Sequence, residues 1–253
     1  MAETQTRFAR FVGRHEAAQP LLPAVRITNV VGFGKALDCR TLKLNDEGLL
    51  YFFYGKPSFK ISKKHSIPTK ILGDAAVCFV LDLSSLPEIH RAFALDTGAY
   101  HGKRYDNYLP NGLLLADFEL PVGAQSLQQL VRAFFGDNER YYSGHAKADL
   151  TLDALDHASE VYANIIRSAV SSGLDERACS CELQFNQPIE LLRECLITII
   201  MPGLLYDDPE VKKFVTEVGI IPILYRFKRA SPDERTEVVY EKLGDFYEQR
   251  KLL

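Results

Sequence analysis

Three apolar runs of strand length restrict the fold more than any other feature of this sequence. They are Leu49 to Tyr54, Val77 to Asp82 and Leu196 to Met201, and each is rich in β-branched or aromatic residues. Segments with helical spacing lie between and after these runs, but strands and helices do not alternate regularly. The pattern predicts an α+β fold, with a mixed or mostly antiparallel sheet of about six or seven strands and flanking helices.

Four weaker strands complete the predicted sheet. They are expected at Arg7 to Val12, Leu113 to Leu120, Ala178 to Phe185 and Ile220 to Tyr225. No glycine-rich phosphate loop follows any predicted strand. The sequence therefore argues against a doubly wound sheet that binds a dinucleotide.

Helices are predicted where apolar residues repeat at helical spacing between capping residues. The predicted helices are Thr28 to Leu37, Ser126 to Phe135, Asp153 to Ser172, a helix from Asp208 to Gly219, and a last helix from Ser231 toward Arg250. The start at Asp208 is the most specific, because a capping aspartate is followed by Pro209 at the first helical position.

Length and composition are typical of one folded domain. A chain of 253 residues with 47% hydrophobic residues can bury a sizeable core, so we expect a single domain over 1–253, with 231–253 as a candidate helical appendage. A net charge of -3 gives no overall attraction to nucleic acid or to anionic membranes. The N-terminus lacks the apolar core of a signal peptide, and no apolar run could span a bilayer, so the expected location is cytoplasmic, with no membrane partner.

The cysteines favour reduced thiols over a disulfide framework. There are five, an odd number, and most lie in apolar runs: Cys39, Cys78, Cys179, Cys181 and Cys195. No second pair of Cys or His residues supplies zinc-binding spacing, so no metal is expected.

Glu182 is the strongest candidate for catalysis. A period of two places it on one face of its predicted strand with Ser180 and Gln184. A carboxylate in the middle of an interior strand is costly to bury unless it has a partner or a chemical role. The competing interpretation is a glutamate that faces water on a half-exposed antiparallel sheet.

Other constellations of functional residues are less specific. The Gly-x-Ser-x-Gly elbow of a serine hydrolase is absent. A catalytic pair of a cysteine nucleophile and a histidine is a further alternative, although the cysteines lie in sequence surroundings typical of a core. His90, Asp96 and His101 lie in a long polar loop and could bind a metal. The basic and aromatic run Tyr100 to Tyr108 could bind nucleic acid, and Lys60 to His65 forms a basic segment best explained as a solvated loop.

The order of these segments resembles the ADP-ribosyltransferase-like proteins, especially the bacterial members that act as toxins or in phage defence. The resemblance rests on an N-terminal strand with arginines, a short helix, an aromatic strand and a late strand with a glutamate. In this chain these are Arg7 to Val12, Thr28 to Leu37, Leu49 to Tyr54 continued by Gly55 to Phe59, and Asp175 to Gln184 followed by Pro188-Ile189 and Leu196 to Pro202.

The resemblance implies that NAD is a substrate and assigns roles to five residues. Glu182 would hydrogen-bond the nicotinamide ribose and stabilise positive charge at its anomeric carbon. Arg10 would contact the NAD phosphates or the nicotinamide amide, and Tyr54 would stack on the nicotinamide ring. Lys56 and Ser58 are further binding candidates. The implied function is an ADP-ribosyltransferase or an NAD glycohydrolase.

Two departures from the family pattern leave the acceptor open. The Ser-Thr-Ser strand motif is missing, and Ser180 stands where protein-modifying members carry Gln or Glu. The acceptor could be nucleic acid, protein, a small molecule or water, and a regulatory partner protein is compatible with a defence system. The alternative function is a non-catalytic module that binds a nucleotide, nucleic acid or protein. That alternative rests on the Tyr100 to Tyr108 run.

Overall fold

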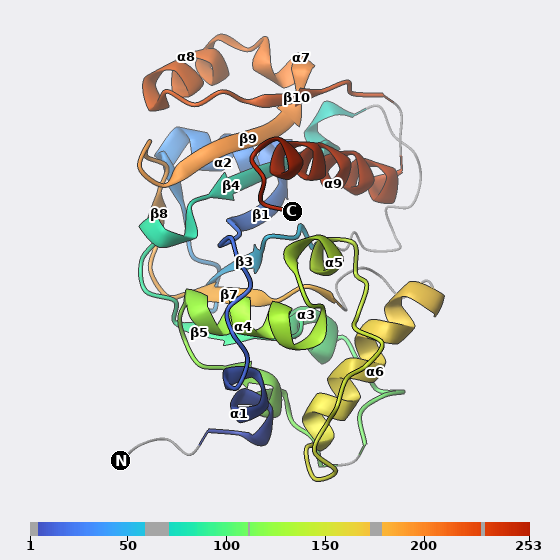
Figure 1. Cartoon of the computed structure of the whole chain (residues 1–253). Helices are drawn as coiled ribbons and strands as arrows, with labels where there is room; N and C mark the ends of the chain where they lie inside the picture. Colours follow the sequence, from blue (N-terminus) through green and yellow to red (C-terminus); the bar gives the residue numbers. More distant parts are fainter. Residues whose placement is uncertain (1–4, 59–70, 111, 173–178, 229–230) are drawn as a thin grey trace. The chain divides into compact units, whose positions relative to one another are not determined.

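The structure is a computed structural model that describes residues 5–58, 71–110, 112–172, 179–228 and 231–253. Contacts within the chain divide it into two compact units (Figure 1). Unit 1 comprises Met1–Leu22, Glu88–Gln184 and Leu252–Leu253, and unit 2 comprises Pro23–Pro87 and Phe185–Lys251. The single domain expected over 1–253 stays a prediction. The basic segment Lys60 to His65 lies outside the described residues.

The fold is α+β with a mixed sheet, as the sequence predicts. Unit 2 holds five main strands in the order β10-β9-β4-β1-β3, and unit 1 holds three in the order β7-β5-β6. These eight strands slightly exceed the six or seven predicted. The pair β9–β10 is parallel, and the other pairs within each unit are antiparallel.

The strands of unit 2 include all three strong runs of the sequence. They are β1 (Ala24–Asn29), β3 (Leu50–Tyr54), β4 (Ala76–Leu81), β9 (Leu196–Pro202) and β10 (Ile223–Tyr225). A separate two-stranded ladder pairs β2 (Thr41–Leu42) with β8 (Ile189–Glu190). Every residue of β4 is buried, which explains why this strand has an unbroken apolar sequence instead of an alternating one.

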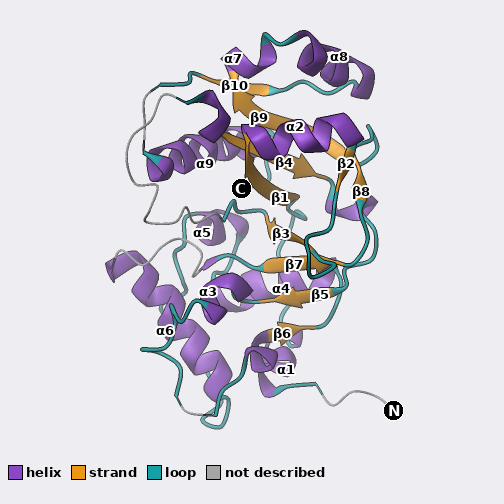
Figure 2. Cartoon of the chain, turned by 180° about the vertical axis from the view of Figure 1, so that it is seen from behind, coloured by secondary structure: helices purple, strands orange, loops and turns teal. Residues whose placement is uncertain are grey.

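Helices cover both faces of the unit 2 strands. Figures 1 and 2 show α2 (Val30–Cys39) over one face of β4 and α9 (Pro232–Gln249) over the other. Among its described residues, the remaining helical segments of this unit are η2 (Leu72–Asp74), η3 (Leu83–Ser85), α7 (Gly203–Tyr206) and α8 (Pro209–Val218).

The capping residues of unit 2 show where local sequence rules hold. Asp208 caps α8 as predicted, and Gly219 ends it in the left-handed conformation, with φ 73°. Ser231 caps α9. The predicted helix cap at Thr28 is wrong by one residue. Thr28 belongs to β1, and the Asn29 side chain accepts the Gly32 N–H at 2.8 Å to begin α2.

Unit 1 combines three short strands with helices of different lengths. The strands are β5 (Arg91–Phe93), β6 (Glu119–Leu120) and β7 (Glu182–Phe185), whose last residue falls in unit 2. The helical segments are α1 (Arg7–Gly13), α3 (Thr97–His101), η4 (Leu115–Phe118), α4 (Ala124–Phe134), α5 (Asn138–Tyr142) and α6 (His157–Ser172).

Two predicted strands of this unit are wrong. The segment Arg7 to Val12 is the helix α1, because Phe8, Phe11 and Val12 are spaced to bury one helical face against α4 and α6. The central half of Leu113 to Leu120 is the helical turn η4, and only its last two residues pair as β6.

An aromatic cluster forms the core of unit 1. The ring centroid of Phe134 lies 5.7 Å from that of Phe8 and 4.7 Å from that of Tyr162. All three side chains are fully buried. Within the residues described, no helix is long and apolar enough to cross a membrane.

The buried hydroxyls of Tyr162 and Tyr141 give a matched pair of stability predictions. The Tyr162 hydroxyl has no hydrogen-bond partner in the described part of the chain, so Tyr162→Phe should stabilise unit 1 by up to about 1 kcal/mol. The Tyr141 hydroxyl accepts the Cys181 N–H at 3.2 Å, so Tyr141→Phe should destabilise it by about 1–3 kcal/mol. Urea denaturation measures both variants, and equal effects would contradict the assigned hydrogen bond.

Candidate functional site

The strand β7 carries Glu182 into the interior of unit 1. All four residues of β7 are buried, and the Glu182 side chain is only 2% exposed. The alternative of a glutamate facing water on a half-exposed sheet is therefore wrong. Of the sequence stretch that precedes the strand, residues 175–178 lie outside the described part.

Three hydrogen bonds hold the Glu182 carboxylate. The Thr97 N–H donates to Oε2 at 2.9 Å, and the Thr97 hydroxyl donates to Oε1 at 2.7 Å. The Gln184 amide Nε2 also donates to Oε1, at 2.8 Å. Both carboxylate oxygens are thus satisfied from two different chain segments, which fixes the orientation of the group.

The pairing of β5 with β7 explains how Thr97 reaches Glu182. Phe93 of β5 stands opposite Glu182 in the antiparallel register, and the chain continues from Phe93 into α3. Asp96 caps that helix by accepting the Ala99 N–H at 2.7 Å, which leaves the N–H of Thr97 directed at Glu182.

Burial raises the pKa of Glu182 to about 7. The hydrogen bonds from Gln184 and Thr97 favour the ionised form and oppose this shift, whereas the nearby negative charge of Asp96 adds to it. A carboxyl group with a pKa of about 7 changes its charge near neutral pH. Groups of this kind are common at catalytic sites.

Gln184 offers a buried acceptor beside this carboxylate. Its Nε2 must face Glu182, because the carboxylate only accepts hydrogen bonds when it is ionised. Its Oε1 therefore faces away from Glu182, and it is buried without a partner in the described part of the chain. An N–H or O–H group of a ligand could satisfy this atom.

Arg10 lies apart from the carboxylate. It is exposed on α1 and lines a small cavity of about 60 Å³ with Arg7, Arg14, Asp153 and Asp156. Glu182 does not line this cavity. The predicted contact of Arg10 with NAD stays a prediction.

The other three predicted binding residues belong to unit 2. Tyr54 ends β3, and Gly55 turns the chain with φ 62°, which favours glycine. Lys56 follows with its ammonium 5.9 Å from the centroid of the Tyr240 ring. Tyr54, Lys56 and Ser58 are all buried. Burial of a lysine and a serine beside a tyrosine is compatible with a binding role, which stays a prediction.

Sequence reasoning missed Thr97 and did not connect Asp96 with Glu182. The region from Glu88 to Pro110 reads as a long polar loop, but it holds β5 and α3. The available signal was an aspartate followed by a short helical segment, which is a capping pattern. No group of three His, Cys, Asp or Glu side chains in the described ranges could hold a metal, and this covers His90, Asp96 and His101.

Asp96 and Thr97 should shift the pKa of Glu182 in opposite directions. Asp96→Asn removes the nearby negative charge and keeps a capping side chain, so it should lower the pKa of Glu182. Thr97→Val removes a donor to the ionised form and should raise this pKa. Carbon NMR titration of the glutamate carboxyl groups measures both, and shifts in the same direction would contradict the geometry.

Comparison of the chain with family models, with curated proteins and with solved structures finds no match.

Proposed function

We propose that this protein cleaves the bond between nicotinamide and ribose in NAD, as an NAD glycohydrolase or an ADP-ribosyltransferase. Glu182 is its catalytic carboxylate. The observation that carries the proposal is the buried Glu182 carboxylate, held by three hydrogen bonds and with its pKa raised to about 7. NAD is proposed as the substrate because three of the chain's four segments resemble those of ADP-ribosyltransferase-like proteins. The fourth, Arg7 to Val12, is the helix α1 and not a strand.

The chemistry requires stabilisation of positive charge on a sugar ring. When the glycosidic bond breaks, the electron pair leaves with nicotinamide and the ribose becomes oxocarbenium-like. A carboxylate held in a site of low dielectric stabilises that charge more strongly than it would in water. Addition of an acceptor O–H to the anomeric carbon then releases a proton, and water as the acceptor gives ADP-ribose.

The hydrogen bonds from Thr97 and Gln184 prepare Glu182 for this role. They fix the carboxylate before the substrate arrives, so little reorganisation is needed as charge develops. The Oε1 of Gln184, which has no hydrogen-bond partner among the described residues, supplies an acceptor for a ribose hydroxyl next to the same carboxylate.

The remaining roles rest on the resemblance alone. Arg10, Tyr54, Lys56 and Ser58 are proposed to bind NAD. A cytoplasmic toxin or phage-defence setting, an acceptor that is nucleic acid or protein, and a regulatory partner protein are proposed on the same basis.

The test is release of nicotinamide from NAD by the purified protein, followed by chromatography. We expect release by the wild-type protein and by Glu160→Gln, which alters an exposed glutamate of the same unit. Recovery of free ADP-ribose would identify a glycohydrolase, and ADP-ribose attached to an added acceptor would identify a transferase. If the folded protein releases no nicotinamide with water, nucleic acid or protein as acceptor, the proposal is wrong.

A non-catalytic nucleic-acid-binding module is the second candidate. The observation that favours it is the exposed basic run His101, Lys103 and Arg104, where α3 ends. Nucleic-acid binding that weakens steeply with added salt, without release of nicotinamide, would support this candidate over catalysis.

A further inference from the structure

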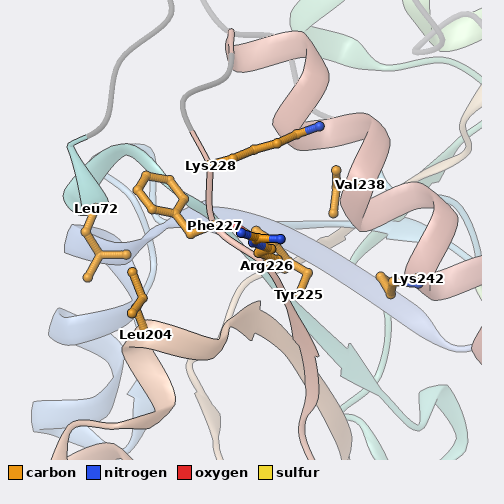
Figure 3. A pocket seen from close by; sticks show the side chains of 8 residues that line it. All are labelled: Leu72, Leu204, Tyr225, Arg226, Phe227, Lys228, Val238 and Lys242. Carbon is orange, nitrogen blue, oxygen red and sulfur yellow. The ribbon is translucent and has the colours of Figure 1, made fainter.

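Unit 2 contains a cavity of about 810 Å³, within the range of small-molecule binding sites (Figure 3). It lies between α9, the segment that follows β10, and the helical turns η2 and α7. Its lining combines apolar and aromatic side chains with three cationic ones. The apolar and aromatic residues are Leu72, Leu204, Tyr225, Phe227 and Val238, and the cationic residues are Arg226, Lys228 and Lys242. None of these lining residues belongs to the Glu182 site.

The segment after β10 divides the lining into two sides. Figure 3 shows Lys228 extending toward α9, while Phe227 turns toward Leu72 and Leu204. The two side chains are consecutive along the segment that follows β10. One side of the cavity is therefore apolar, and the side toward α9 is cationic.

The cationic side offers a ligand two cations, Arg226 and Lys228. Lys242 is balanced, because its ammonium lies 3.0 Å from Asp245 and 3.6 Å from Glu241. Arg226 and Lys228 are exposed, and within the described ranges neither has a hydrogen-bonded carboxylate. Lys228 has an electrostatic interaction with Glu234, whose carboxylate instead hydrogen-bonds the N–H of Ser231 at the start of α9.

We propose that this cavity binds an organic anion with an apolar or aromatic body. The body packs against Leu72, Leu204 and Phe227, and the anionic group is bound by Arg226 and Lys228. The two cations supply charge-assisted hydrogen bonds, and the guanidinium can bind a carboxylate or a phosphate through two parallel bonds. The apolar side excludes small inorganic anions as the preferred ligand, because they would leave its surface exposed to water.

Two classes of ligand have this chemistry, aliphatic carboxylates and nucleoside phosphates, and one probe of each class distinguishes them. Octanoate carries a carboxylate on an aliphatic chain, and adenosine monophosphate carries a phosphate on an aromatic nucleoside. Their neutral analogues, octanol and adenosine, keep the body and remove the charge. Isothermal titration calorimetry with all four compounds measures what each part contributes to binding.

We expect one of the two anions to bind at least about tenfold more tightly than its neutral analogue. The double variant Arg226→Gln, Lys228→Gln should abolish that preference, and Val238→Trp, which fills the cavity, should weaken binding about tenfold or more. The control is Lys212→Gln, Lys213→Gln, which removes the same charge from α8 outside the cavity. Melting temperatures establish that each variant is folded.

The proposal is overturned if neither anion binds more tightly than about 1 mM. It is also overturned if the control lowers affinity as much as the cavity variants do, or if the neutral analogues bind as well as the anions. Release of nicotinamide from NAD is a separate readout, so failure of this proposal leaves the assignment of Glu182 unchanged.

Discussion

Glu182→Gln is expected to lower the rate of nicotinamide release from NAD by about 10²–10³. The substitution keeps the size of the side chain and an acceptor oxygen for Thr97. It removes the negative charge that, in the proposed mechanism, stabilises the oxocarbenium-like ribose. The loss should appear in kcat more than in KM, because the charge on the ribose develops only in the transition state.

The comparison depends on a matched control and on an intact fold. Glu160→Gln makes the same chemical change at an exposed position of unit 1 and should leave kcat within about twofold of the wild-type value. Circular dichroism and melting temperature establish that both variants are folded. Equal rates for wild-type protein and Glu182→Gln would remove Glu182 from the mechanism.

The same substitution should change how stability depends on pH. The pKa of Glu182 is raised in the folded protein from 4.5 to about 7, chiefly by burial. Between these values the folded state holds a proton that the unfolded state has lost, so the wild-type protein loses stability as pH rises. The loss is complete above the folded pKa and amounts to about 3 kcal/mol.

The Glu182→Gln variant has no carboxyl group that titrates at this position. Its free energy of unfolding, relative to that of the wild-type protein, should therefore rise by about 3 kcal/mol between about pH 4 and about pH 8. Urea denaturation at both pH values measures the change, and the other titrating groups cancel in the difference. A relative stability that is constant or that falls with pH would show that Glu182 is not a buried carboxyl group with a raised pKa.

Predictions from sequence succeeded where a local signal was strong. The runs that became β3, β4 and β9 are long and apolar, and Asp208-Pro209 specifies a helix start by backbone chemistry alone. The strand predicted at Arg7 to Val12 is wrong, because a short segment in which each arginine is followed by two apolar residues matches a strand or a helix about equally well. Its helical form is selected by burial of Phe8 against Phe134 and Tyr162.

The candidate site could be predicted only in part. Glu182 stood out because a carboxylate in the middle of a predicted strand is unusual. In the structure it is the first residue of β7, not a central one, but its burial agrees with that reasoning. Its partner Thr97 is separated from it by 85 residues and meets it through the register of β5 with β7. Nothing in the local sequence encodes that register. Contacts of this kind arise from tertiary packing, and a single sequence does not specify them.

The measurement that tests the central claim most directly is the pH dependence of kcat/KM for nicotinamide release by the wild-type protein. In the proposed mechanism the ionised form of Glu182 is the active one, and burial raises the pKa of Glu182 to about 7. We therefore predict that kcat/KM rises about tenfold per pH unit below that value and is constant above it. A profile that is flat through neutral pH, or that falls as pH rises, would contradict the assignment of Glu182 as the catalytic carboxylate.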